Sequence, residues 1–73
     1  MRDKDFKFVW YPSDDTDELY DLRNDPLELT NLAKIPKYRK VALRMANQLE
    51  SELIRVADPS AERLSFQKQL YMH

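Results

Sequence analysis

The sequence predicts an α+β fold, in which a small antiparallel sheet packs against a long amphipathic helix. Large aromatic residues alternate within residues 6–11, as expected of a strand with one buried face. A shorter apolar run at residues 18–22 follows a polar stretch and completes a hairpin. Residues 37–57 carry apolar side chains at three-and-four spacing, which is the period of a helix with one buried face.

The hairpin is expected to span residues 6–22. The aromatic face of its first strand carries Phe6, Phe8 and Trp10. The opposite face carries Lys7, Val9 and Tyr11. Pro12 and the polar run 13–17 break this strand, so they are predicted to form the hairpin loop. Asn24-Asp25-Pro26 ends the second strand, because Asn and Asp favour turns and Pro26 lacks a backbone donor.

The rest of the chain is predicted to be mainly helical. A turn and a short helical turn are expected over residues 23–35, before Pro36. The apolar face of the long helix carries Tyr38, Val41, Ala42, Met45, Leu49, Leu53 and Val56. Asp58-Pro59 ends that helix, and Ser60 is predicted to cap a second, shorter helix within the tail 60–71.

Length and composition limit the function. The 73 residues are enough for one small domain, 1–73, with a thin core. A net charge of -1 gives no overall field to attract nucleic acid or anionic lipid. The absence of cysteine excludes disulfides, thiolate metal sites and a nucleophilic thiol. Because glycine is also absent, left-handed turn positions are expected to fall on Asn or Asp.

Several polar residues are candidates for catalytic or metal-binding groups. Carboxylates lie close in sequence at Asp14, Asp15, Asp17, Glu18, Asp21, Asp25 and Glu28. They lack the glycine and the spacing of an EF-hand calcium loop, so support of turns is the favoured interpretation. No histidine adjoins the serines Ser13, Ser51, Ser60 and Ser65. His73 is the last residue, where fraying is expected, so no catalytic, cofactor-binding or metal residue is assigned.

Two surfaces are candidates for partner sites. The first is a basic cluster suited to phosphate or sulfate groups, which consists of Lys34, Lys37, Arg39, Lys40 and Arg44. A solvated helix face is the favoured interpretation of this cluster. The apolar stripe of the long helix, with Tyr38, Met45, Leu49 and Leu53, is more often core than a binding groove. A hairpin with one helix leaves a sheet face or edge uncovered, which favours self-association if the chain stands alone.

Residues 18–33 contain the most specific local pattern. They read Glu-Leu-Tyr-Asp-Leu-Arg-Asn-Asp-Pro-Leu-Glu-Leu-Thr-Asn-Leu-Ala. This string resembles the ELYDL-x-x-DP-x-E-x-x-NLA signature near the C-terminal end of arylsulfatase-type sulfatases. In that family, too, the signature follows an aromatic strand and a loop and precedes a long amphipathic helix. The resemblance covers about residues 6–57, and the tail 60–73 has no counterpart in it.

The resemblance implies a C-terminal subdomain that packs beside the catalytic domain of a sulfate ester hydrolase. The family uses a formylglycine, made within a Cys/Ser-x-Pro-x-Arg motif, and a calcium ion held by Asp and Asn residues. Both belong to the N-terminal catalytic domain, and no serine here begins that motif. Calcium and formylglycine are therefore expected only in the catalytic domain, and this chain is not expected to be an enzyme by itself.

The expected partners are the sulfatase catalytic domain or a second copy of the chain, and neither nucleic acid nor membrane. No apolar run approaches the length that spans a bilayer, so a soluble chain is expected. It would be periplasmic or secreted if it is part of a typical sulfatase. The alternative function is a free-standing oligomerising or partner-binding module derived from such a subdomain.

Overall fold

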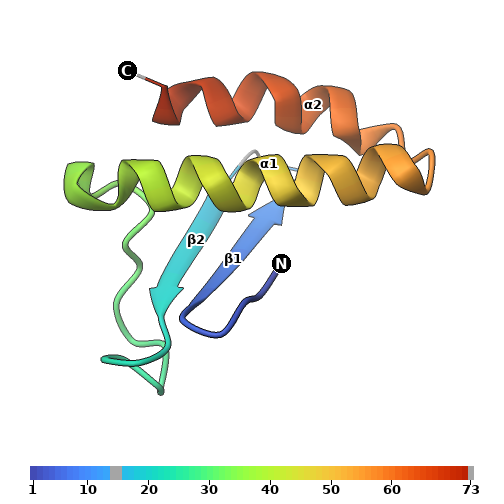
Figure 1. Cartoon of the computed structure of the whole chain (residues 1–73). Coiled ribbons are helices and arrows are strands. Elements are labelled where there is room, and N and C mark those ends of the chain that lie inside the picture. Colours follow the sequence, from blue (N-terminus) through green and yellow to red (C-terminus); the bar gives the residue numbers. More distant parts are fainter. Residues whose placement is uncertain (14–15, 73) are drawn as a thin grey trace.

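A two-stranded antiparallel hairpin lies beneath two helices in the computed structural model, which describes residues 1–13 and 16–72. The strands are β1 (Phe6–Tyr11) and β2 (Thr16–Asp21). The helices α1 (Arg39–Arg55) and α2 (Ser60–Gln67) run side by side over one face of the hairpin (Figure 1). Short 3-10 turns, η1 (Pro36–Tyr38) and η2 (Lys68–Tyr71), precede α1 and follow α2. The predicted α+β class, with a second short helix, is confirmed.

The inner face of the hairpin supplies the centre of the core. Phe8 lies directly opposite Leu19 in the strand register, and both side chains are fully buried. Trp10 is also buried on this face, and Phe6 is partly buried with its ring edge-on to Tyr38. The predicted aromatic face of β1 is therefore the one that packs against the helices.

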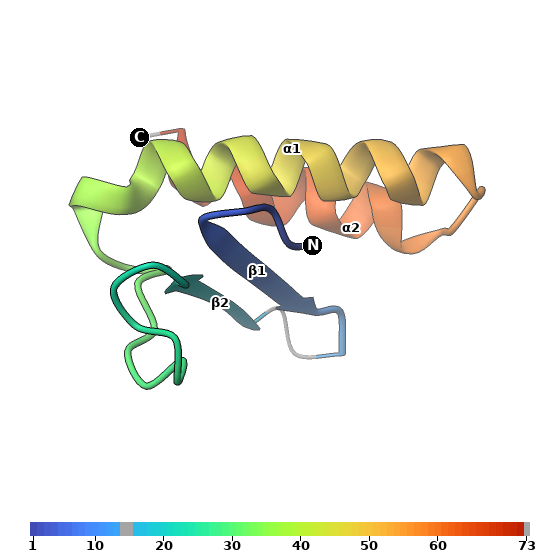
Figure 2. The same cartoon turned by 60° about the horizontal axis from the view of Figure 1, so that its bottom comes forward.

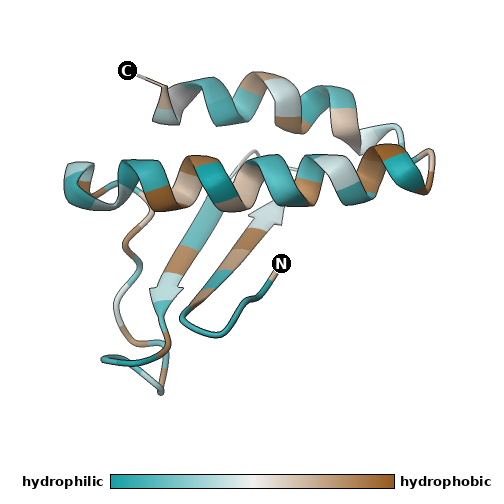
Figure 3. Ribbon diagram, viewed as in Figure 1, coloured by the Kyte–Doolittle hydropathy of each residue, from teal (hydrophilic) through white to brown (hydrophobic). Residues whose placement is uncertain are grey.

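Both helices contribute to the same core. Ala42, Met45 and Ala46 of α1 are fully buried, as is Leu64 of α2. The Tyr71 ring meets the Phe8 ring edge-on, with the ring centroids 6.3 Å apart. Figure 3 shows hydrophobic and hydrophilic bands alternating along both helices, as amphipathic helices require. The tail after Pro59 is thus part of the core.

The backbone groups at both outer edges of the hairpin find partners. At the edge of β1, the Phe8 amide donates to the Met1 carbonyl over 2.7 Å, and the Met1 amine donates to the Phe8 carbonyl over 3.0 Å. At the edge of β2, the Leu32 amide donates to the Leu19 carbonyl over 2.8 Å. Groups that could template pairing with another chain are therefore occupied at these positions. No helix within the described ranges covers the outer face of the hairpin (Figure 2).

The boundaries of the regular elements differ from the predicted ones. β2 begins at Thr16 and ends at Asp21, whereas a strand over 18–22 was predicted. The reason is that Tyr11 and Trp10 pair with Thr16 and Asp17, which extends the ladder toward the loop. The long helix is α-helical over a shorter span than 37–57, since residues 36–38 form the 3-10 turn and Val56 already departs from helical geometry.

The predicted helical turn within 23–35 is wrong, because this segment contains no helix. Its backbone donors bond elsewhere: the Leu29 and Thr30 amides donate to the Asp25 carboxylate, and the Leu32 amide donates to β2. A helical hydrogen-bond ladder would need these same donors. Figure 1 shows the resulting loop extending away from the helices.

The cap of α2 was also predicted wrongly. Ser60 is the first residue of α2, and its amide donates to the Asp58 carboxylate over 2.9 Å. The Ala61 amide donates to the Asp58 carbonyl. Asp58 therefore satisfies donors at the start of α2 across Pro59, which itself has no amide hydrogen to satisfy.

Left-handed backbone occurs at Glu28 and Ala57, each with φ of 57°, and the expected Asn or Asp does not take these positions. At the end of α1 the Asp58 amide donates to the Leu53 carbonyl and the Ala57 amide to the Ile54 carbonyl. This pair of bonds is a Schellman motif, which needs a left-handed residue at the place that Ala57 occupies. The motif satisfies helix-end carbonyls even though alanine is less suited than glycine to that backbone.

We predict that Leu64→Ala lowers the free energy of unfolding by about 2–5 kcal/mol, because it opens a cavity where α2 meets the sheet and α1. Leu29→Ala is the matched control, since Leu29 is 79% exposed and should have little effect. Chemical denaturation of both variants measures the difference. Equal effects of the two substitutions would show that the tail does not pack in the core.

Candidate functional site

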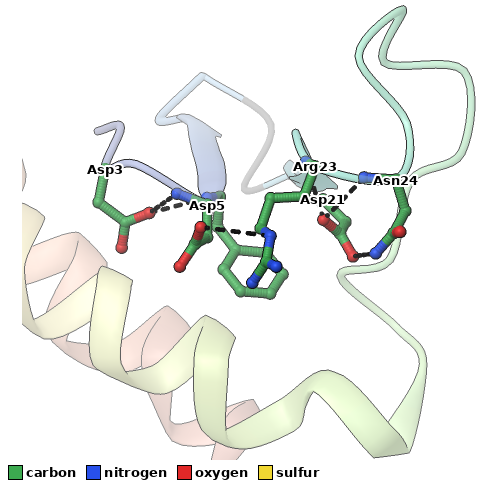
Figure 4. A network of polar contacts seen from close by, with 6 residues as sticks. Asp3, Asp5, Asp21, Arg23 and Asn24 are labelled. Atoms are coloured by element: carbon green, nitrogen blue, oxygen red, sulfur yellow. Dashed lines mark hydrogen bonds and ion pairs between the residues drawn. The ribbon is translucent and has the colours of Figure 1, made fainter.

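The first polar network of the signature lies at the end of the hairpin where β1 begins and β2 ends. Asp21 accepts hydrogen bonds from the Arg23 and Asn24 amides and from the Asn24 side chain (Figure 4). These bonds, led by the one from the Asn24 side chain, lower the pKa of Asp21. Asp5 faces the Arg23 guanidinium at 3.8 Å, and its carbonyl accepts from the Leu22 amide. Asp21 therefore fixes the turn after β2.

The second network organises the loop that follows. The two Asp25 carboxylate oxygens accept from the Leu29 and Thr30 amides at 3.0 and 2.9 Å. The Asp25 carbonyl accepts from the amide of Glu28, the residue in left-handed geometry. Leu27 and Leu29 stand outward on this loop and are 76% and 79% exposed. The loop thus has a defined backbone and displays two leucines.

Asn31 connects the loop to the sheet. Its Oδ1 accepts from the Leu19 amide at 3.0 Å and from the Ala33 amide at 2.9 Å. Its Nδ2 donates to the Asp17 carbonyl at 3.2 Å. One side chain thereby takes the place of a neighbouring strand along the free edge of β2. Asp25 and Asn31 therefore both satisfy backbone donors of the signature segment.

The outer face of the hairpin is polar where the signature crosses it. The Tyr20 hydroxyl donates to Glu18 Oε1 at 2.6 Å, and this hydrogen bond raises the pKa of Tyr20 to about 12. Lys7 Nζ lies 2.7 Å from Glu28 Oε1, which joins the loop to β1. Glu18 and Glu28 therefore have cationic or hydroxyl partners within the chain.

A cleft of about 590 Å³ opens beside the start of β2 and is a candidate binding site. It lies between β2, the segment that leads into α1, and the C-terminal tail. Its lining consists of Thr16, Asp17, Glu18, Asn31, Ala33, Lys34, Ile35, Arg39, Gln67 and Tyr71. Polar groups of both charges converge here on one deeply buried carboxylate.

That carboxylate belongs to Asp17, whose side chain is only 8% exposed. Burial raises its pKa, and a hydrogen bond from Gln67 and the charge of Lys34 oppose this shift only in part. Because the folded-state pKa is raised, the ionised group destabilises the fold as pH rises through that pKa. The shift of Asp21 has the opposite sign, so its contribution to stability is lost as pH falls below the ordinary value of 3.8.

The described carboxylates among those that lie close in sequence do not form a metal-binding group. Across residues 1–13 and 16–72, no group of three or more His, Asp or Glu side chains is placed to hold an ion. Asp14, Asp15 and His73 lie outside the described residues.

Ser51 donates to the Asn47 carbonyl one helical turn back. None of the helices in this part of the chain is both long and apolar enough to cross a bilayer.

The basic cluster is divided among different contacts. Arg44 pairs with Asp3 at 3.0 Å, and Lys37 lies over the Tyr38 ring, 5.7 Å from its centroid. Lys34 and Arg39 line the cleft beside Asp17. These four members of the cluster therefore lie against three different parts of the chain.

The cleft was not predicted from the sequence, because Asp17 was assigned to the hairpin loop. With a strand that begins at Thr16, the two-residue period puts Asp17 on the inner face with Leu19. An acidic residue at an inward strand position is the signal that could have identified the site. The tail residues Gln67 and Tyr71 complete the lining, and no pattern in the sequence places them near β2.

The fold and these contacts define a small α+β subdomain whose signature side chains organise its own backbone. The chain belongs to the family described as N-sulphoglucosamine sulphohydrolase, C-terminal, whose model matches residues 1–55. The sulfatase resemblance of the signature is thereby confirmed. α2 and η2 lie beyond the matched residues, as the sequence predicted for the tail.

Two relatives are similar over 58 residues, which is 80% of this chain. An uncharacterized protein of Haemophilus influenzae is 40% identical over that length. The Delta 4,5-hexuronate-2-O-sulfatase of Bacteroides thetaiotaomicron is 36% identical. The aligned region spans 29% of the first relative and 12% of the second, so both relatives are much longer than the part they share with this chain.

We predict that Asn31→Ala lowers the free energy of unfolding by about 1–3 kcal/mol, because three hydrogen bonds are lost and the Leu19 amide is left without its acceptor. Amide hydrogen exchange should accelerate at Leu19 and Ala33 before it does in α1. Gln48→Ala, at an exposed position of α1, is the control and should leave exchange unchanged. Unaltered protection of Leu19 in the Asn31 variant would contradict this role.

Proposed function

We propose that this chain acts as a noncatalytic C-terminal subdomain of a sulfatase and packs on the catalytic domain. The observation that carries the proposal is the match of residues 1–55 to a family of sulphohydrolase C-terminal regions. The sulfatase of Bacteroides thetaiotaomicron supports it, because the shared region is only 12% of that enzyme. Hydrolysis of the sulfate ester would then be carried out by the remainder of such a protein.

The polar contacts support a structural role for the signature. Asp21, Asp25 and Asn31 accept hydrogen bonds from backbone amides, and Glu18 and Glu28 have side-chain partners. A catalytic acid or base needs to reach a substrate proton, and these groups are already engaged. Calcium and formylglycine are therefore expected in the catalytic domain of the longer protein.

The loop that displays Leu27 and Leu29 is the surface that we expect to contact the catalytic domain. Leu27 and Leu29 project into solvent from a loop whose backbone is fixed by Asp25, and they lie within the family-matched region. Exposed leucines on an ordered loop gain free energy when a partner covers them, about 25 cal/mol for each Å² of apolar surface. A preorganised loop also loses little entropy on docking.

We predict that the chain restores function when it replaces the matching region of the Bacteroides thetaiotaomicron sulfatase. Three proteins are compared for hydrolysis of an unsaturated 2-O-sulfated hexuronate: the graft, the same enzyme truncated before that region, and the 73-residue chain alone. The graft should be active, because the subdomain supports the catalytic domain. The truncated enzyme should aggregate or be inactive, and the isolated chain should show no hydrolysis.

The surface is tested in the same graft with the double substitution Leu27→Ser and Leu29→Ser, which should lower its melting temperature and activity. Ile54→Ser is the control, because Ile54 is similarly exposed but lies at the far end of α1. Hydrolysis by the isolated chain would refute the noncatalytic assignment. A graft no better than the truncated enzyme would refute packing on the catalytic domain.

A second candidate function is a self-associating module. Ile54 and Phe66 are 63% and 70% exposed, and both line a shallow groove of about 400 Å³ between α1 and α2. Phe66 lies outside the family-matched residues, so its exposure is not explained by the sulfatase assignment. A second copy of the chain would cover this groove and bury both side chains.

If the second candidate holds, the isolated chain forms dimers whose population rises with concentration, and Phe66→Ser shifts it to the monomer. Sedimentation velocity over a wide concentration range measures this. Met72→Ser is the control, since Met72 is also exposed but does not line the groove. A chain that stays monomeric at every concentration removes this candidate.

A further inference from the structure

The Asp17 cleft contains two buried oxygen atoms that lack hydrogen-bond partners. Within the described residues, no group donates a hydrogen bond to Asp17 Oδ2, and the Tyr71 hydroxyl has no hydrogen-bond partner. Asp17 and Tyr71 are 8% and 7% exposed, and both line the same cleft. Buried polar atoms in folded proteins are nearly always hydrogen-bonded, so this pair indicates that a donor is supplied from outside.

The surrounding residues show which kind of donor fits. An ionised carboxylate that is buried and only partly compensated is costly, whereas a cationic donor satisfies both its charge and its hydrogen bonds. Lys34 acts on Asp17 only through its charge and donates no hydrogen bond to Oδ2. Glu18, the other carboxylate of the cleft, already accepts from Tyr20.

A metal ion fits the cleft poorly. Hard cations need several oxygen ligands, and the described residues contain no group of three or more carboxylate or imidazole side chains that could hold one. A nitrogen cation needs fewer ligands, and it can use Asp17 and Tyr71 as its two acceptors.

We propose that the Asp17 cleft receives an ammonium or guanidinium group, a basic side chain of the catalytic domain that precedes this region in a full-length sulfatase. The inference rests on the proposed function, because the catalytic domain is the partner it requires. It adds a polar anchor to the apolar contact assigned to Leu27 and Leu29. The cleft is wide enough, at about 590 Å³, to accept the end of a long side chain.

Opposite effects of one substitution test this inference. Asp17→Asn removes the charge but keeps a side chain of the same shape that can still bond Gln67. In the isolated chain the substitution should raise the melting temperature by about 4–8 °C, because a buried charge that Gln67 and Lys34 offset only in part disappears. In the graft with the catalytic domain it should lower the melting temperature, because the basic side chain loses its partner.

Two further variants sharpen the result. Tyr71→Phe keeps the ring against Phe8 and removes only the hydroxyl, so it should act in the same direction as Asp17→Asn but more weakly. Glu62→Gln neutralises an exposed carboxylate of α2 and should have little effect in either protein. Methylguanidinium at millimolar concentration should shift the amide resonances of Asp17, Lys34 and Gln67 in the isolated chain, and acetate should not.

Each outcome decides between the alternatives. Destabilisation of the isolated chain by Asp17→Asn would mean that the carboxylate is already paired internally, which overturns the inference. The same follows if methylguanidinium shifts no resonance of the cleft. A graft that is active and stable, but in which Asp17→Asn raises the melting temperature, overturns only the cleft assignment. A graft that fails to assemble refutes the proposed function and, with it, the source of the cation.

Discussion

The contact between Phe8 and Leu19 is the interaction on which the rest of the fold depends. These two residues face each other across the hairpin, and both are fully buried. Such a hairpin is marginally stable in water until another element covers it. α1 supplies Met45 and two alanines, and the tail adds Leu64 and Tyr71. The packing of α1 and of the tail therefore serves to cover this face of the hairpin.

A thin core leaves much of the specificity to hydrogen bonds at the edges of the sheet. The signature meets this need with short polar side chains: Asp21 and Asp25 hold turns, and Asn31 takes the place of a third strand beside β2. Each bond contributes about 1 kcal/mol, which matters in a domain with little apolar burial. The same residues could be taken for a metal or acid/base site in the sequence, because carboxylates and amides serve both purposes. Their geometry shows that they bind their own backbone.

The sequence predicted the fold class, the buried face of β1 and the position of the long helix, since periodicity reports burial directly. It failed where side chains and backbone compete for the same donors. The 23–35 segment has helix-forming residues, but Asp25 and β2 take the amides that a helix would use. The start of β2 was missed because Thr16 and Asp17 are polar, and only the length of β1 determines that they pair. The cleft joins residues 16–18 to Gln67 and Tyr71, a contact that no local pattern encodes.

Asp17 is the feature that the stability of the isolated fold does not explain. An inward strand position opposite Trp10 suits an apolar residue, and a carboxylate there bears a desolvation cost that Gln67 and Lys34 offset only in part. Two general causes leave such a group in place: a ligand or partner that binds it, or a role in selecting one arrangement over others. The unpaired Oδ2 and the Tyr71 hydroxyl favour the first cause. A polar group that served only to select one arrangement of the chain would have its hydrogen-bond partners within the chain. The proposed basic side chain of a partner would offset this cost, in a chain whose relatives are much longer than the region they share with it.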